Sequence, residues 1–291
     1  MEVQIQEVVS SVRAVDSEAL LTPQVMQQIV GVVLKAVREA KLRTSWINPD
    51  AEYEAALERF VERSLASSLF RKEAGELIAR LSRIGLLVGL SQALLKVASP
   101  GVPDYYQGTE LWDFSLVDPD NRRPVDFAAR RRTLEELERR LAAEGPEALA
   151  ADLLDRWPTG EIKLYTLWRL LTLRRGDPEL FVHGDYLPLE AEGERGEHVV
   201  AFARRAGEGS GERWLLAAVP RWTALLTEDE DLPLGGAVWG ETVVRSPDQI
   251  QVGWRDRLTG RELGGGGGRL RVAELFAVYP GCVLESLQPA G

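Results

Sequence analysis

The chain has 291 residues, which exceeds the usual single-domain length of about 100 to 200, so we expect two domains or one large incomplete one. Hydrophobic residues make up 45% and charged residues 27%, a balance that is typical of soluble globular proteins and excludes a disordered chain. The formal net charge of −10 disfavours nucleic acids and anionic membrane surfaces as partners, whereas a neutral ligand such as a sugar is compatible with it.

The cysteine and histidine content predicts no metal site and no cofactor. Cys282 is the single cysteine and has no internal disulfide partner, and His183 and His198 have no cysteine cluster at a zinc-binding spacing. We expect Cys282 to be a small buried residue and the protein to be cytoplasmic. Residues 1–10 lack the basic start and apolar core of a signal peptide, and no apolar run reaches the roughly 20 residues of a membrane span.

Three helices are predicted in the first hundred residues. Thr22 to Lys41 has apolar residues at intervals of three and four, with Thr22 as the N-cap. Ala51 to Leu65 follows Asp50, which can cap it, and Arg71 to Ala98 becomes denser in apolar residues toward its end. The third helix is therefore expected to run into the core.

A short apolar segment with two tyrosines, Val102 to Tyr106, follows the turn Ser99-Pro100-Gly101 and ends before Gly108. Its length and flanking turns are typical of one buried parallel strand. Such a strand requires neighbouring strands to pair with.

Helical patterns return over Phe127 to Ala143, Pro146 to Leu154 and Gly160 to Arg175, with Asp126 as the cap of the first. The arginine clusters at residues 130–132 and 174–175 are interpreted as solvated helix faces.

The chain changes character after Gly176, where short β-type runs alternate with turns rich in glycine, proline and glutamate. This pattern predicts a small antiparallel domain. The glycine run Gly264 to Gly268 is interpreted as a hairpin tip, because it lacks the ending and the following helix of a phosphate loop. The predicted β runs are Phe181 to Leu189, Val199 to Arg204, Trp214 to Val219, Gly236 to Val244, Leu270 to Phe276 and Gly281 to Leu287.

Two polar, aromatic-rich segments between residues 99 and 126 favour saccharide binding. Aromatic rings offer flat faces for stacking on a sugar, and amide and guanidinium groups can recognise its hydroxyls. Tyr105 and Trp112 can equally be core residues beside the strand. Our candidate sugar-contacting residues are Trp46, Tyr106, Gln107, Glu110, Asp120, Asn121, Arg122 and Arg123.

The acidic residues of this region were considered as a catalytic pair, since retaining glycoside chemistry needs two carboxylates about 5 to 5.5 Å apart. A simpler interpretation is that Asp118 and Asp120 shape a proline-containing turn. In that interpretation Glu110 forms an ion pair with Arg122 or Arg123. We favour this second interpretation, and we expect no catalytic or metal-binding role for either histidine.

The runs SPGVPDYYQGTELWD (residues 99–113) and LVDPDNRRPVDF (residues 116–127), together with TSWINP (residues 44–49), closely resemble those of the maltooligosyltrehalose synthases, members of the α-amylase superfamily. The resemblance implies an α-amylase-type (β/α)8 barrel with a C-terminal β domain, in which residues 102–106 form the last barrel strand. The nucleophile, the acid/base and the third carboxylate of the family come from earlier strands, so none can be assigned in this chain.

The expected fold is therefore an α+β fragment. Residues 1–176 would form a mostly helical C-terminal part of the catalytic barrel, including its last strand and the rim loops 99–126, and residues 177–291 a small antiparallel β domain. The missing strands would leave a large apolar surface exposed, which a companion chain could cover.

By resemblance, the function is that of the C-terminal segment of an intramolecular transglucosylase acting on maltooligosaccharides, with the segment inactive alone. The alternative is a glucan-binding or structural partner module of a split enzyme. An isolated fragment and a degenerate gene product also remain open.

Overall fold

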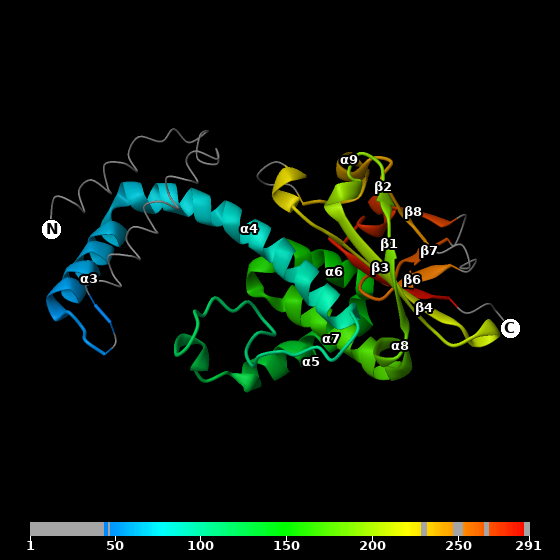
Figure 1. The fold of residues 1–291 in the computed structure, drawn as a ribbon, viewed down its shortest axis with the longest axis horizontal. Coiled ribbons are helices and arrows are strands. Elements are labelled where there is room, and N and C mark those ends of the chain that lie inside the picture. Colours follow the sequence, from blue (N-terminus) through cyan, green and yellow to red (C-terminus); the bar gives the residue numbers. More distant parts are fainter. Residues whose placement is uncertain (1–43, 46, 228–231, 247–252, 265–267, 288–291) are drawn as a thin grey trace. The chain divides into compact units, whose positions relative to one another are not determined.

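The computed structural model describes residues 44–45, 47–227, 232–246, 253–264 and 268–287 (Figure 1). The chain divides into two compact units, Met1–Leu77 and Ile78–Gly291. The predicted helix over Thr22 to Lys41 and the candidate residue Trp46 lie outside the described residues.

The described part of the first unit contains helix α3, Ala51–Ala66, as predicted. Its start is set by Asp50, whose carboxylate accepts a hydrogen bond of 3.0 Å from the backbone N–H of Tyr53. Ser67 adopts an extended conformation and ends the helix. Helix α4, Ser68–Ala98, begins directly after it and continues into the second unit.

The second half of α4 lies in the core of the second unit. Leu86, Leu90, Leu94 and Val97 recur at intervals of three and four residues and are at most 3% exposed. Among the described helices, α4 is the one long and apolar enough to cross a membrane, a test that core helices of soluble proteins also pass. Its C-terminal half packs against protein here, as predicted from the sequence.

Four further helices follow in the second unit: α5 (Phe127–Glu144), α6 (Pro146–Asp155), α7 (Glu161–Gly176) and α8 (Pro178–Val182). The first begins at Asp126, whose side chain accepts a hydrogen bond from the N–H of Ala129. The sequence predicted α5, α6 and α7 to within one or two residues at each end, and α8 replaces the start of a predicted strand.

Two antiparallel sheets complete the second unit. The six-stranded sheet has the order β1-β3-β4-β9-β6-β7 and the three-stranded sheet the order β2-β5-β8. The strands are β1 (Asp185–Leu189), β2 (Ala191–Glu192), β3 (Val199–Ala206), β4 (Arg213–Pro220), β5 (Val243–Arg245), β6 (Trp254–Asp256), β7 (Glu262–Leu263), β8 (Arg269–Arg271) and β9 (Cys282–Ser286).

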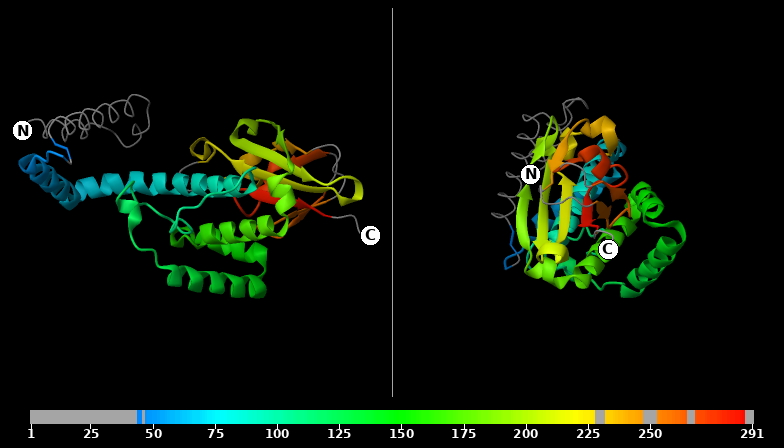
Figure 2. Two further views of the ribbon diagram at one scale, coloured as in Figure 1. Left: turned by 60° about the horizontal axis from the view of Figure 1, so that its bottom comes forward. Right: turned by 90° about the vertical axis from the view of Figure 1, so that its right-hand side faces the viewer.

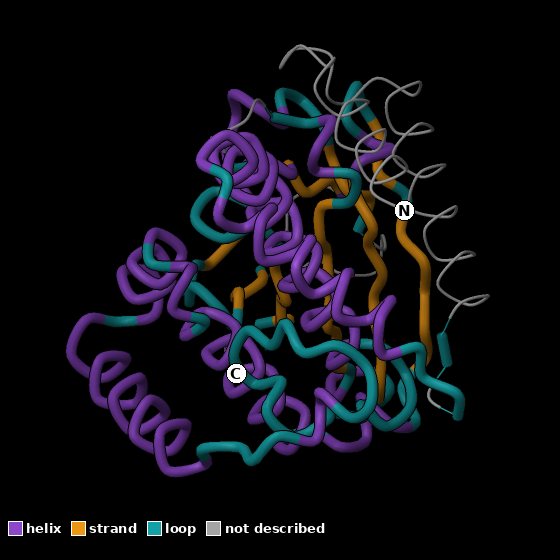
Figure 3. The backbone as a smooth tube through the Cα atoms, turned by 90° about the vertical axis from the view of Figure 1, so that its left-hand side faces the viewer, coloured by secondary structure: helices purple, strands orange, loops and turns teal. Residues whose placement is uncertain are grey.

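The six-stranded sheet separates two hydrophobic clusters, because successive side chains of a strand point to opposite faces. On β4, Leu215 and Ala217 join the helices α4, α6 and α7, whereas Leu216 and Ala218 face the second sheet. Figures 2 and 3 show the longer helices α5, α6 and α7 on one side of the strands, whereas the short helices near the second sheet contribute to the other cluster. Cys282 is fully buried in the second cluster, as predicted.

Three strand predictions are wrong. Val102 to Tyr106 is an irregular segment with Val102 91% exposed, because no strand in the described part of the chain lies beside it to accept its hydrogen bonds. The runs Gly236 to Val244 and Leu270 to Phe276 are strand at one end only, in β5 and β8, and contain the short helices α9 (Gly235–Trp239) and α10 (Val272–Leu275). Residues 265–267 of the predicted hairpin tip lie outside the described residues, and the strands before and after them, β7 and β8, belong to different sheets.

Candidate functional site

The end of α4 is held by two arginines on other elements. Arg174 of α7 donates hydrogen bonds to the carbonyl oxygens of Val97 (2.7 Å), Ser99 (3.2 Å) and Gly101. Arg204 of β3 donates to the carbonyl oxygen of Ala98 (3.3 Å). The last carbonyl groups of a helix have no partner within it, so these cations both satisfy them and complement the helix dipole.

The segment that follows α4 is fixed next to Lys96. The Lys96 ammonium donates to the carbonyl oxygen of Asp104 at 2.9 Å and lies 4.6 Å from the centre of the Tyr105 ring. Tyr105 packs against the hydrophobic core, and burial raises the pKa of its hydroxyl to about 12. Its neighbour Tyr106 is exposed and remains available to a ligand.

Arg130 of α5 closes both ends of the loop between residues 108 and 126. Its guanidinium donates to the Glu110 carboxylate (2.8 Å), to the carbonyl oxygen of Gly108 (2.7 Å) and to that of Asp126 (3.2 Å). The predicted partners of Glu110, Arg122 and Arg123, bind other carboxylates instead. Arg130 is therefore a loop anchor and no solvated arginine, contrary to the sequence interpretation.

The loop is also attached to α7 and the turn before it. The Trp112 indole N–H donates to the carbonyl oxygen of Trp157 at 2.7 Å, and Lys163 donates to that of Leu111 at 3.2 Å. Gly160, with φ +78°, leaves room for the backbone of Trp112, which a Cβ atom would approach to 3.0 Å. Of the two interpretations of Trp112, core packing is the one confirmed.

The middle of the loop folds through its own carboxylates. Asp120 accepts a hydrogen bond of 2.8 Å from the N–H of Leu116 and also pairs with Arg123, while Asp118 pairs with Arg122. The predicted turn-shaping role is confirmed for Asp120, which bonds the loop backbone, whereas the Asp118 carboxylate binds the Arg122 side chain. Hydrogen bonds from Ser115 hold the pKa of Asp113 below its usual value.

Asn121 differs from its neighbours because its side-chain oxygen is buried and has no hydrogen-bond partner. A buried acceptor without a donor is costly, so this atom is suited to receive a hydroxyl or N–H group from another molecule. Gln107 is exposed in the turn after the irregular segment. The structure thus places seven of the candidate residues on one anchored loop: Tyr106, Gln107, Glu110, Asp120, Asn121, Arg122 and Arg123.

The carboxylates of the loop do not form the pair that retaining glycoside chemistry requires. Glu110, Asp118 and Asp120 are each engaged by an arginine. Within the described residues, no group of three or more histidine, cysteine, aspartate or glutamate side chains could hold a metal ion.

We compared the chain with protein families, with curated proteins and with solved structures. No family model matches the chain. A curated protein of Mycobacterium tuberculosis strain H37Rv that carries the name maltooligosyl trehalose synthase is 37% identical over 246 residues, which are 84% of this chain and 26% of the relative. The solved structure of maltooligosyltrehalose synthase from Arthrobacter ramosus is 38% identical to this chain, with a TM-score of 0.66. The match covers 87% of this chain and 29% of the Arthrobacter ramosus chain.

The chain is similar to maltooligosyltrehalose synthases over more than four fifths of its own length. It corresponds to a C-terminal portion of the family's chains and spans between a quarter and a third of the length of the relatives that it matches. A maltooligosyl trehalose synthase structure from Sulfolobus tokodaii, described as hypothetical, is 25% identical over 91% of this chain, with a TM-score of 0.57. The resemblance noted in the sequence is confirmed.

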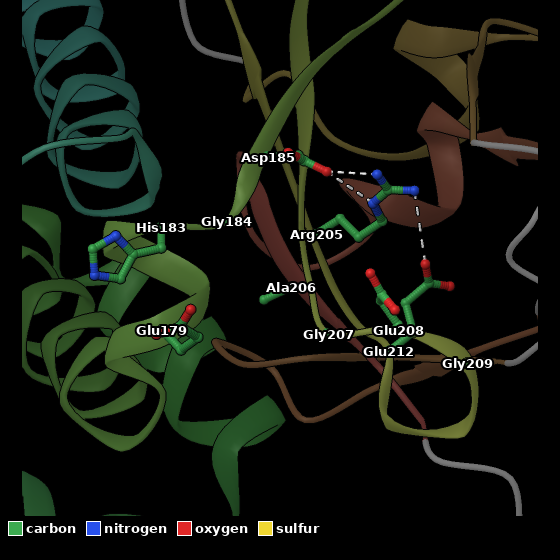
Figure 4. A pocket seen from close by; sticks show the side chains of 10 residues that line it. All are labelled: Glu179, His183, Gly184, Asp185, Arg205, Ala206, Gly207, Glu208, Gly209 and Glu212. Carbon is green, nitrogen blue, oxygen red and sulfur yellow. Dashed lines mark hydrogen bonds and ion pairs between the residues drawn. The ribbon is translucent and has the colours of Figure 1, made fainter.

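A groove of about 400 Å³ lies elsewhere in the second unit, between α8 and the turn that joins β3 and β4 (Figure 4). The Arg205 guanidinium lies between the carboxylates of Asp185 (2.6 Å) and Glu212 (3.8 Å), and His183 points away from all three. The groove offers a sugar no flat apolar ring. It does not resemble the saccharide surface expected of a maltooligosyltrehalose synthase.

Sequence reasoning missed the three arginines that fix the loop: Arg130, Arg174 and Arg204. The sequence held one signal for Arg204. Side chains of a strand alternate between its two faces, so Arg204 lies on the same helix-facing side of β3 as the core residue Phe202. A cation at such a position requires several acceptors. No comparable signal distinguishes Arg130 from the exposed Arg131 and Arg132.

Proposed function

We propose that this chain supplies the saccharide-orienting loop and the β domain of a maltooligosyltrehalose synthase. The family reaction moves the terminal α-1,4 glucosidic link of a maltooligosaccharide to an α,α-1,1 link by intramolecular transglucosylation. The observation that carries the proposal is the anchored loop 99–126, whose free groups are those that a sugar needs. Tyr106 and Gln107 are exposed, and Asn121 has an unpaired acceptor.

In this proposal the catalytic carboxylates come from the part of the longer relatives that has no counterpart in this chain. The acids of the loop support this assignment, because Glu110, Asp118 and Asp120 are each already engaged by an arginine. The chain alone is therefore inactive in this proposal. Its cytoplasmic location also stays a prediction.

The partner of the chain is the remaining part of such an enzyme, present in the same or in a companion polypeptide. Three apolar side chains of α4, Ile78, Leu81 and Val88, lie 40–59% exposed on the face opposite the core. Phe114 and Val117 of the loop are more than 80% exposed. Exposed apolar side chains of this size and number favour an interface with another part of such an enzyme.

The test is to purify the chain and to incubate it with maltopentaose, alone and after co-expression with the unmatched N-terminal portion of a relative. The expected result is a nonreducing product only in the complex. Product from the chain alone would contradict its inactivity. A stable complex that binds maltopentaose but never forms the product would contradict the proposed function.

The role of the loop is tested in that complex with Asn121→Ala, which removes the unpaired acceptor. We expect KM for maltopentaose to rise several-fold. Arg131→Ala on the exposed side of α5 is the matched control and should leave KM unchanged. Equal KM values for the two variants would remove Asn121 from the site.

A further inference from the structure

Trp222 has an unusual backbone conformation. Its φ of 52° is the only positive value of a residue other than glycine among the described residues. A bulky side chain in the left-handed region costs on the order of 1–2 kcal/mol, so the surrounding structure must enforce it. Trp222 follows β4 and immediately precedes a short 3-10 helix, Thr223–Leu225.

The enforcing contacts come from the segment that precedes β3. The N–H of Arg221 donates to the carbonyl oxygen of His198 at 2.8 Å, and the Arg221 side chain donates to the carbonyl oxygen of Glu197 at 2.5 Å. The carbonyl oxygen of Trp222 itself accepts from the N–H of Leu225 at 2.9 Å. Both sides of Trp222 are therefore fixed by hydrogen bonds.

The ring that this backbone presents is exposed and rigid. It is 54% exposed and belongs to neither hydrophobic cluster, whereas every other tryptophan in the described part of the chain is buried or half-buried. The Arg221 guanidinium lies 4.2 Å from its centre, and the His198 ring meets it edge-on at 6.2 Å. The ring would lose little freedom on binding a ligand.

Polar groups of both kinds stand beside the ring. Arg221 is a donor, and the Glu197 carboxylate, which is 70% exposed and lies 3.8 Å from the His198 ring, is an acceptor. Because the Arg221 guanidinium lies over one face of the ring, the exposed remainder of the ring is the platform, with this donor and the Glu197 acceptor near it. Such a platform complements a pyranose, which has an apolar C–H face and adjacent hydroxyls. The acidic neighbour and the net charge of −10 disfavour phosphorylated ligands.

We propose that Trp222, Arg221 and Glu197 form a second saccharide site, separate from the loop 99–126, which holds a glucose unit of an α-glucan chain. The choice of an α-glucan rests on the proposed function, whereas the site itself rests on the geometry around Trp222. With one ring as the platform, the affinity is expected in the millimolar range. Such a site would keep long substrates near the enzyme.

The test is the retardation of the purified chain in native gels that contain soluble maltodextrin. Trp222→Gly removes the ring, and because glycine adopts a positive φ without strain, the variant should melt at the same or a higher temperature. We expect it to lose at least fivefold in apparent affinity. Trp222→Phe should retain part of the retardation, and the exposed neighbour Leu225→Ala should retain all of it.

The variant pair Asn121→Ala and Arg123→Ala separates this site from the loop and should leave the Trp222-dependent retardation intact. Retardation that disappears with the loop variants but persists in Trp222→Gly would overturn the second site. A chain that maltodextrin never retards would also overturn it, while product formation in the complex would still decide the proposed function. Loss of companion binding in Trp222→Gly, with retardation unchanged, would make Trp222 a protein contact and refute the saccharide site.

Discussion

Arg204 donates a hydrogen bond of 3.3 Å to the carbonyl oxygen of Ala98, which joins the middle of β3 to the last residue of α4. The side chain is fully buried, and its remaining N–H groups reach the carbonyl oxygens of Phe181, Gly184 and Asp185. These four acceptors are all backbone carbonyl oxygens, so peptide dipoles stabilise the charge. Burial lowers the pKa of this guanidinium, which nevertheless stays protonated.

Replacing Arg204 by methionine should destabilise the chain strongly. The change removes the donors of four buried or partly buried carbonyl groups, and each unsatisfied group costs about 1–3 kcal/mol. We expect the free energy of unfolding to fall by about 3 kcal/mol or more in urea titrations. The matched control is Arg205→Met, since its ion pair with Asp185 is largely exposed and should contribute less than about 1 kcal/mol. Equal losses in the two variants would contradict this account.

Replacing Arg130 by alanine should release the loop without unfolding the second unit. The guanidinium is the shared partner of Gly108, Glu110 and Asp126, and the core residues of α4 and the sheets do not depend on it. We expect amide hydrogen exchange to accelerate at least tenfold over residues 108–126. Arg132→Ala on the exposed side of α5 should leave exchange unchanged. Unaltered exchange in Arg130→Ala would show that Trp112 and Lys163 suffice to hold the loop.

The helices were predictable because the sequence signals that start, end and orient a helix lie within the helix or next to it. Caps such as Asp126, glycine or proline at the ends and apolar spacing of three and four are properties of neighbouring residues, and α3, α5, α6 and α7 were confirmed closely. The strand over Val102 to Tyr106 failed, because a strand exists only where another strand accepts its hydrogen bonds. The interpretation of its sequence as a barrel strand presupposes residues beyond those described.

The sequence predicted the location and composition of the candidate loop but not its hydrogen bonds and ion pairs. Its polar and aromatic residues predicted two loops between residues 99 and 126, and the resemblance of the sequence to maltooligosyltrehalose synthases is confirmed. The choice of Arg130 as the partner of Glu110, 20 residues away, depends on how α5 packs. Sequence neighbours Arg122 and Arg123 were nearer candidates and bind Asp118 and Asp120 instead.

Two buried tyrosines should respond oppositely to the loss of their hydroxyl groups. The Tyr165 hydroxyl donates to the carbonyl oxygen of Leu258, whereas the Tyr105 hydroxyl is buried with no partner. Tyr165→Phe should therefore lower the free energy of unfolding by about 1 kcal/mol or more, and Tyr105→Phe should leave it unchanged or raise it. Urea titrations at pH 7 compare the two variants. A similar loss in Tyr105→Phe would mean that its hydroxyl has a partner in solution.

The raised pKa values of these buried tyrosines lead us to expect a loss of stability at alkaline pH. Burial raises the pKa of Tyr165 to about 12, above the value of about 10 in an unfolded chain. Between these values the folded state keeps a proton that the unfolded state releases, so the stabilisation is complete below about pH 10 and declines by about 1.4 kcal/mol per pH unit as the pH rises toward 12. Tyr105, whose pKa is also raised to about 12, adds a decline of the same kind. Urea titrations at pH 9, 10 and 11 should therefore show a slope steeper than that of Tyr165 alone, reduced by about 1.4 kcal/mol per pH unit in Tyr165→Phe and unchanged in Tyr106→Phe, whose ring is exposed. Parallel curves for wild type and Tyr165→Phe would show that Tyr165 ionises in the folded protein as readily as in the unfolded chain.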